Sequence, residues 1–112
     1  MTRKSDASKI KWRASGPKEI LGYDSSDDFV STPRGFRSRA HDLRVYRTSA
    51  NGWALRYHWR VTRIQVSRSG AIGAETLAAG EVEFGPHDDA RAARKLAQEQ
   101  AEAAYFAARK HV

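Results

Sequence analysis

The sequence predicts an α+β fold in which a three-stranded antiparallel sheet packs against one C-terminal helix. Three observations predict it: residues 53–61 alternate apolar and polar side chains, Asn51-Gly52 marks a turn just before them, and residues 87–110 are rich in helix formers. A chain of 112 residues suits a single domain with a packed core. We expect residues 1–42 to form an irregular, basic N-terminal arm and loop, and residues 43–112 to form the sheet-plus-helix domain.

The first two strands are expected to form a β-hairpin over residues 43–61, with Asn51-Gly52 in its loop. The length of the loop decides the register. A two-residue loop would pair Val45 with His58 and mix apolar and polar side chains on each face. A three-residue loop that includes the preceding alanine pairs Val45 with Tyr57 and keeps the apolar residues together, so we favour it.

The third strand is expected over residues 76–84. Before it, the alternation of the second strand slips, because the apolar residues that follow Val61 are Ile64 and Val66. A β-bulge near residues 62–63 would explain the slip.

The C-terminal segment predicts a helix from about residue 87 to residue 110. Asp88 and Asp89 complement the positive end of its dipole, and a stripe of alanines lets it lie close to a sheet that carries large aromatic side chains. The predicted core consists of Leu43, Val45, Trp53, Leu55, Tyr57, Trp59, Val61, Val82, Phe84 and Leu96.

Positive charge is concentrated in the first part of the chain. The whole sequence has 20 basic and 13 acidic residues, and nine arginines between residues 34 and 68 are accompanied by a single acid, Asp42. Such a block attracts nucleic-acid phosphates, acidic protein surfaces or anionic lipid headgroups. A GC-rich genome, which favours arginine over lysine, would give the same bias without any ligand.

The polar face of the predicted hairpin is the candidate binding site. Arginine pairs bidentately with phosphate and with guanine edges, and tyrosine or histidine stacks on bases. The predicted nucleic-acid-binding residues are Arg44, Tyr46, Arg56, His58 and Arg60 on the sheet, with Arg34, Arg37 and Arg39 in the preceding loop. Two other interpretations stay open: a merely solvated charged face, or a face that the N-terminal arm covers.

The sequence argues for a binding protein and against an enzyme. It has no cysteine, and its four histidines are scattered, so we expect neither a metal nor a cofactor. The acid pairs Asp27-Asp28 and Asp88-Asp89 have no neighbour in sequence that would tune proton transfer. No apolar run is long enough to span a membrane and no signal peptide is evident, which predicts a cytoplasmic protein with no membrane partner.

Residues 43–100, with the order strand, turn, strand, strand, helix, resemble the small DNA-binding domains of phage integrase arm-binding and AP2-like proteins. The segment AGEVEFGPHDDARAARKLA (79–97) is similar to the third strand of those domains and the acidic, alanine-rich start of their helix. The resemblance implies that the sheet reads double-stranded DNA. The same pattern is similar to small actinobacterial and actinophage proteins, which implies a phage accessory protein acting in the host cytoplasm.

A protein-interaction module is the alternative function, such as a phage factor that docks on a host protein or a minor subunit of a larger assembly. Trp12, Phe36 and Tyr46 lie near arginines in the sequence, a combination typical of protein interfaces. Its partner would be an acidic protein surface. A homodimer through the helix or an edge strand is compatible with either function.

Overall fold

The computed structural model describes residues 10–31, 33, 35, 37–50, 54–85 and 87–110. In chain order the described elements are β1 (Ile10–Gly16), β2 (Glu19–Asp24), β3 (Phe29–Ser31), β4 (Arg37–Arg39), β5 (His41–Ala50), β6 (Ala54–Val66), β7 (Ile72–Phe84) and α2 (Ala90–Lys110). Four features of the sequence analysis lie outside the described residues: Arg34, Phe36, Trp53 and the Asn51-Gly52 turn.

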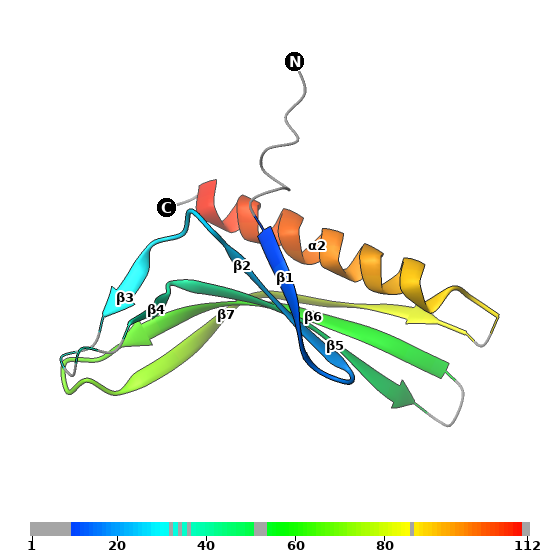
Figure 1. Cartoon of the computed structure of the whole chain (residues 1–112), viewed down its shortest axis with the longest axis horizontal. Helices are drawn as coiled ribbons and strands as arrows, with labels where there is room; N and C mark the ends of the chain where they lie inside the picture. Colours follow the sequence, from blue (N-terminus) through cyan, green and yellow to red (C-terminus); the bar gives the residue numbers. More distant parts are fainter. Residues whose placement is uncertain are drawn as a thin grey trace, which may run out of the picture.

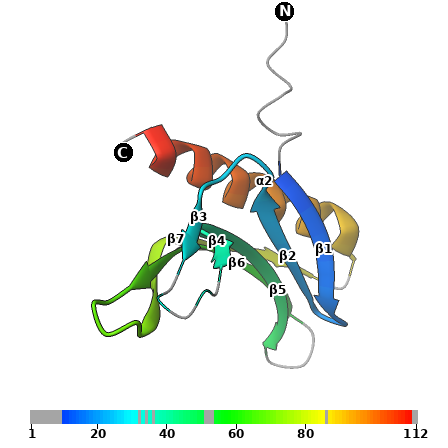
Figure 2. The ribbon, with the colours of Figure 1, turned by 60° about the vertical axis from the view of Figure 1, so that its left-hand side comes forward.

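The described strands form a five-stranded antiparallel sheet in the order β1-β2-β5-β6-β7 and a separate two-stranded sheet of β3 and β4. The expected three-stranded sheet is therefore wrong. β1 and β2 lie in the segment expected to be irregular, and β2 pairs with β5 to extend the sheet. Figure 1 shows the long strands bowing beneath α2, and Figure 2 shows the helix as a separate layer on one face of the sheet.

Strand β2 was not predicted from the sequence, because the residues on its inward face are not all apolar. They are Ile20, Gly22 and Asp24, of which Gly22 and Asp24 are buried. A glycine and an aspartate at buried positions of a strand are a loop signal when they are read from sequence alone. Both are instead explained by partners that come from elsewhere in the chain.

Glycines on two strands each lie beneath a tryptophan of the neighbouring strand. Gly22 of β2 pairs with Trp12 of β1, and Gly80 of β7 pairs with Trp59 of β6. A Cβ atom added at Gly22 would lie 2.9 Å from the Trp12 ring, and one added at Gly80 would lie 2.6 Å from the Trp59 ring. Only glycine leaves room for the two indoles to lie flat over the sheet.

Both indoles also donate hydrogen bonds to side chains of α2. Trp12 Nε1 donates a hydrogen bond to Glu102 Oε2 at 2.6 Å, and Trp59 Nε1 donates one to Gln100 Oε1 at 2.9 Å. Burial raises the pKa of Glu102, although the bond from Trp12 opposes that shift. The helix is thus fixed to an outer strand and to an inner strand of the sheet.

The hairpin of β5 and β6 keeps the predicted faces but not the predicted pairs. Val45 pairs with Trp59 rather than with Tyr57, and the pairing continues to Ala50 and Ala54. The expected pairs are wrong by two positions on β6. Because side chains repeat every two residues along a strand, a shift of two leaves every side chain on its expected face.

A β-bulge is present close to the predicted position, at the junction of Val61 and Thr62, but the expectation that it lies in β6 is wrong. There the register with β7 shifts, since Val61 pairs with Ala78 and Thr62 pairs with Thr76. The extra residue is Leu77 of β7, so the bulge belongs to the neighbouring strand and not to β6. Its side chain packs against the core.

The helix buries every fourth residue against the sheet. Asp89 precedes it, and its Oδ1 accepts a hydrogen bond from the Arg91 backbone N–H at 2.9 Å, as an N-cap does. The buried helix residues are Ala93, Ala97, Ala101 and Tyr105. Leu96, expected in the core, is 45% exposed, because the small alanines and not Leu96 face the sheet. No helix of the described residues is long and apolar enough to cross a membrane.

The rest of the predicted core is placed largely as expected. Leu43, Val45, Tyr57, Val61 and Phe84 are buried, and Leu55, Trp59 and Val82 are partly buried and pack against the buried clusters. Ile10 of β1 and Tyr105 of α2 join the core without having been predicted there.

Candidate nucleic-acid interface

The face of the sheet opposite α2 carries the predicted sheet residues. Alternation along β5 and β6 buries Leu43, Val45, Tyr57 and Val61 beneath the helix, so the residues between them point the other way. The structure brings five predicted residues together there: Arg44, Tyr46, Arg56, His58 and Arg60. We call this surface the open face.

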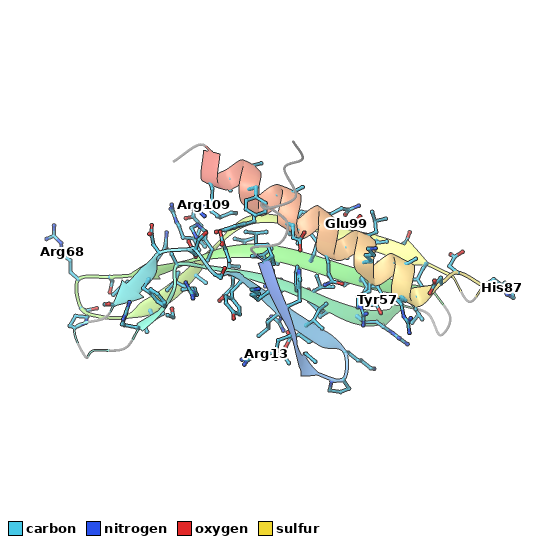
Figure 3. The ribbon with its side chains drawn as sticks, turned by 45° about the horizontal axis from the view of Figure 1, so that its top comes forward. Arg13, Tyr57, Arg68, His87, Glu99 and Arg109 are labelled. Atoms are coloured by element: carbon cyan, nitrogen blue, oxygen red, sulfur yellow. The ribbon has the colours of Figure 1, made fainter. Side chains whose placement is uncertain are left out.

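A row of arginines crosses the open face from strand to strand. Arg13 pairs with Leu21, Leu21 pairs with Arg44, and Arg44 pairs with Arg60, so the four residues follow one line across β1, β2, β5 and β6. We call this line the cationic row. Figure 3 shows Arg13 projecting from β1 away from the helix. Arg44 lies directly opposite Arg60, and like charges in that position are unfavourable for the sheet by themselves.

An aromatic pair lies beside the cationic row. Tyr46 pairs with His58, and their rings stack with centroids 5.1 Å apart and an interplanar angle of 18°. The guanidinium of Arg44 lies 5.0 Å from the centroid of the Tyr46 ring, and Thr48 Oγ1 lies 2.9 Å from His58 Nε2. These contacts orient both rings before any ligand arrives.

Glutamates partly neutralise the open face. Arg56 Nε donates to Glu83 Oε2 at 2.8 Å and lies 3.4 Å from Glu81 Oε2, and Arg44 is paired with Glu19. The hydrogen bond and the charge of Glu83 raise the pKa of Arg56. Within the described residues, Arg13 and Arg60 of the cationic row form no ion pair. Among the described residues, the unpaired charge of this face therefore lies at Arg13 and Arg60 and less at Arg44 and Arg56.

The predicted loop arginines lie elsewhere. Arg37 and Arg39 belong to β4, and both guanidinium groups lie over the Phe29 ring, at 4.2 and 4.3 Å from its centroid. Arg39 also donates hydrogen bonds to the carbonyls of Ser25 and Asp27 at 3.1 Å. These two arginines hold the small sheet of β3 and β4 together and do not join the cationic row.

Sequence reasoning missed Arg13, because β1 was taken for part of an irregular arm. The signal was present: Ile10 and Trp12 alternate with Lys11 and Arg13, which is the pattern of a short strand with one buried face. The pattern spans only four residues, so it did not stand out against the basic N-terminus.

A second group of polar residues was also missed, and its two carboxylates are buried. Tyr105 Oη donates to Asp24 Oδ2 at 2.7 Å, Arg109 Nη1 donates to the same oxygen at 2.8 Å, and His41 Nδ1 lies 3.1 Å from Asp27 Oδ1. We call these five residues the buried polar cluster. It joins the segment around β2 to the start of β5 and the end of α2, and Figure 3 shows Arg109 at that end of the helix.

The cluster holds Asp24 in its charged form. Burial alone would raise the pKa of Asp24, but hydrogen bonds from Ser26 and Tyr105 and the charge of Arg109 outweigh it and lower the pKa. Burial and the bond to Asp24 raise the pKa of Tyr105, so its hydroxyl stays protonated. The Asp27 carboxylate also accepts a hydrogen bond from the His41 backbone N–H at 2.8 Å.

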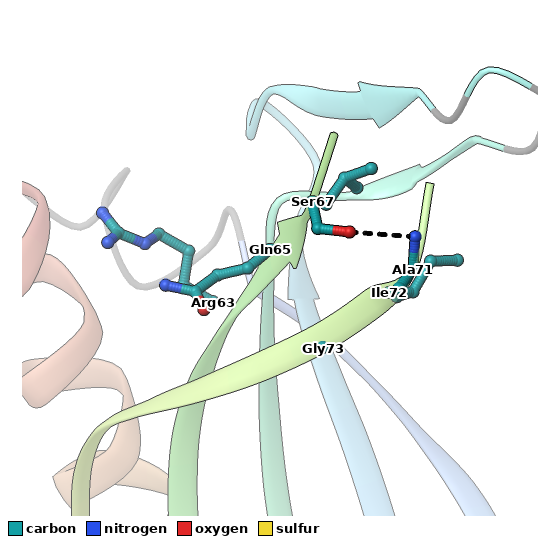
Figure 4. A pocket seen from close by; sticks show the side chains of 7 residues that line it. Arg63, Gln65, Ser67, Ala71, Ile72 and Gly73 are labelled. Atoms are coloured by element: carbon teal, nitrogen blue, oxygen red, sulfur yellow. Dashed lines mark hydrogen bonds between the residues drawn. The ribbon is translucent and has the colours of Figure 1, made fainter. Parts of the chain in front are cut away.

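Hollows on the surface of the described residues include one at each of two turns. The larger, of about 670 Å³, lies at the β6–β7 turn, where Ser67 Oγ accepts a hydrogen bond from the Ala71 N–H at 3.2 Å (Figure 4). The smaller, of about 160 Å³, lies near the β1–β2 turn. The described residues contain no cluster of three or more potential metal-ligating side chains.

Comparison with protein-family models, with curated proteins and with solved structures found no match for this chain.

Proposed function

We propose that this protein binds double-stranded DNA through the open face of its sheet, as an accessory protein without catalytic activity. The observation that carries the proposal is the cationic row of Arg13, Arg44 and Arg60 beside the stacked Tyr46 and His58. The formal net charge of +7 would assist the approach to DNA. In this proposal the protein works in the cytoplasm, where its DNA target lies.

The dimensions of the row suit a phosphate backbone. Neighbouring strands lie about 4.8 Å apart, so three strand spacings from β1 to β6 span roughly 14 Å. One strand of B-DNA rises about 3.4 Å per phosphate, so this span covers roughly four nucleotides. The arginines would bind phosphates bidentately, and the Tyr46–His58 pair would lie against the sugar or a base edge.

Residues 10–24 do not cover the open face. β1 and β2 extend the sheet sideways, which adds Arg13 to the surface. The arginines of β5 and β6 stay accessible, since the side chains of Arg44 and Arg56 are 47% and 38% exposed. Of the described acids in residues 10–31, Glu19 alone pairs with an arginine of the open face, Arg44, which supports the DNA proposal over one in which the arm covers this face.

A fluorescence-anisotropy titration of a labelled random duplex at about 50 and 200 mM salt tests the proposal. Three phosphates neutralised by the row give a salt slope of about −2.7, which weakens binding roughly 40-fold over this range. A matched titration with single-stranded DNA should show weaker binding. Absence of binding at the lower salt, or affinity independent of salt, would remove DNA binding from the account.

Protein interaction is a second candidate function, favoured by the exposed aromatic and arginine cluster of the β3–β4 sheet. Phe29 is 48% exposed although two guanidinium groups lie over its ring, and Tyr23 beside it is 37% exposed. Arginine and aromatic side chains are enriched at protein interfaces. Substitution Phe29→Ser would then abolish capture of a host protein while leaving DNA affinity unchanged. Capture that persists in this variant would argue against the role.

A further inference from the structure

We infer that the cavity of about 160 Å³ near the β1–β2 turn is a binding site for a phosphate group. Three cationic side chains line it, and they come from three different elements: Lys18 from the β1–β2 turn, Arg47 from β5 and Arg94 from α2. The site lies on the helix side of the sheet, because Arg47 pairs with the buried Tyr57. It is separate from the open face and does not depend on the proposed DNA binding.

The backbone fixes the three cations around the cavity. The Arg47 N–H donates a hydrogen bond to the Lys18 carbonyl at 2.8 Å, which holds the turn beside β5. Arg94 follows the buried Ala93 on α2, so the packing of the helix sets its position at the rim. Arg47 itself is partly buried, and reduced access to water strengthens its attraction for an anion.

None of the three cations has a carboxylate partner among the described residues. Glu19 also lines the cavity, but its carboxylate is paired with Arg44. Three converging positive charges without a counter-ion repel one another, and a doubly charged oxyanion would relieve that repulsion. The planar guanidinium groups of Arg47 and Arg94 match the oxygens of a phosphate.

The volume limits the ligand. Pockets that hold drug-sized molecules measure about 300–1,000 Å³, so a cavity of 160 Å³ is too small to enclose a nucleotide. It is large enough for a phosphate group. The apolar wall of Ile20, Val45 and Tyr57 would contact the small organic part of a phosphate monoester. The ligand class is therefore inorganic phosphate or the phosphate of a small monoester.

Nuclear magnetic resonance titrations of the ¹⁵N-labelled full chain test the site. Inorganic phosphate and methyl phosphate are added separately at constant ionic strength, with sodium chloride as the reference salt. We expect saturable shifts of the amides of Gly16, of residues 18–20 and 90–95, and of the Arg47 and Arg94 Nε–H groups. A response to both probes identifies a monoester site, and a response to inorganic phosphate alone identifies a site for the free ion.

Two double variants with the same charge change decide the result. Arg47→Gln with Arg94→Gln should weaken phosphate binding at least about tenfold, the effect of losing one or more charge-assisted hydrogen bonds. Arg91→Gln with Lys95→Gln removes two charges from the same helix outside the cavity and should change the affinity less than about twofold. Should the first variant unfold, Lys18→Gln in the exposed turn replaces it. Shifts that chloride reproduces, or equal affinity in both variants, would overturn the inference.

Discussion

Two arginine–carboxylate pairs of this protein have the same N–O distance, but one carboxylate is buried and the other is exposed. Arg109 meets Asp24 at 2.8 Å in the buried polar cluster, and Arg56 meets Glu83 at 2.8 Å on the open face. The Asp24 side chain is fully buried, whereas that of Glu83 is 60% exposed. Tyr105 and Ser26 also bond to Asp24, while Glu83 bonds to Arg56 alone among the described residues.

The difference separates a structural role from a binding role. A buried carboxylate that loses its partners keeps its desolvation cost, so the Asp24 cluster should stabilise the fold. An exposed pair exchanges its partner for water or for another anion at little cost. In the proposed complex, a phosphate replaces Glu81 and Glu83 as the partner of Arg56, and the sheet stays folded.

The largest effect is expected from Asp24→Ala. The substitution leaves the Tyr105 hydroxyl and one side of Arg109 without their acceptor inside the protein and opens a gap beside β2. We expect the free energy of unfolding to fall by about 3 kcal/mol, at the lower end for a buried pair because Arg109 is partly exposed. Urea denaturation measures the change. A loss below about 0.5 kcal/mol would show that the buried and exposed pairs do not differ.

The next effect in size is the pH dependence of the stability that Asp24 contributes. Because the pKa of Asp24 lies below its ordinary value of 3.8, the folded state binds fewer protons than the unfolded state. Its contribution is complete above pH 3.8 and is lost as the pH falls below that value. The stability gap between the wild type and Asp24→Asn, measured by urea denaturation from pH 7 to pH 3, should narrow below about pH 4.

The pKa values of two other carboxylates are shifted in the opposite direction. The comparison of the wild type with Asp24→Asn therefore has to cancel their effect on stability. Burial raises the pKa of Asp42 and of Glu102, so their contributions become more favourable as the pH falls toward their ordinary values of 3.8 and 4.5. They affect the wild type and Asp24→Asn equally, so the difference between the two proteins isolates Asp24. A gap that widens at low pH would contradict the assigned direction.

A smaller loss is expected from Tyr105→Phe, which removes one hydroxyl and keeps the ring in place. Asp24 keeps its bonds from Ser26 and Arg109, so the unfolding free energy should fall by about 1 kcal/mol. Thermal unfolding followed by circular dichroism measures it. An effect as large as that of Asp24→Ala would mean that the hydroxyl, and not the carboxylate, organises the cluster.

The smallest effect on stability is expected on the open face. Substitution of Glu81 and Glu83 together by glutamine should change the unfolding free energy by less than about 0.5 kcal/mol, because both carboxylates are exposed. The same variant should bind duplex DNA about threefold or more tightly, since two negative charges leave the face. Anisotropy titration provides the affinity, and weaker binding would mean that the glutamates contact the ligand.

The sequence predicted the parts of the fold that follow a simple period. Residues 54–61 alternate and α2 repeats every four residues, so the faces of β5, β6 and β7 and the helix were recognised. The strands β1 and β2, at one side of the sheet, were not. Their inward positions include a glycine beneath a tryptophan and an aspartate whose partners lie about 80 residues away, at Tyr105 and Arg109. No local pattern contains those contacts.

The candidate site was predictable to the same degree. Alternation was sufficient to gather Arg44, Tyr46, Arg56, His58 and Arg60 on one face. The strand order was needed to bring Arg13 into the row and Glu83 against Arg56, since neither neighbour is close in sequence. The sequence therefore indicated which residues share a face. The order of the strands determines which of these arginines lie against a glutamate.

The central claim is that the cationic row, and not the total positive charge, binds DNA. Two double variants that each remove two positive charges test it by anisotropy with a labelled random duplex at about 50 mM salt. Arg13→Gln with Arg60→Gln alters the row, and Arg91→Gln with Lys95→Gln alters the helix on the other side of the sheet. The account predicts at least about tenfold weaker binding for the first and less than a twofold change for the second. Equal affinities for the two variants would contradict it.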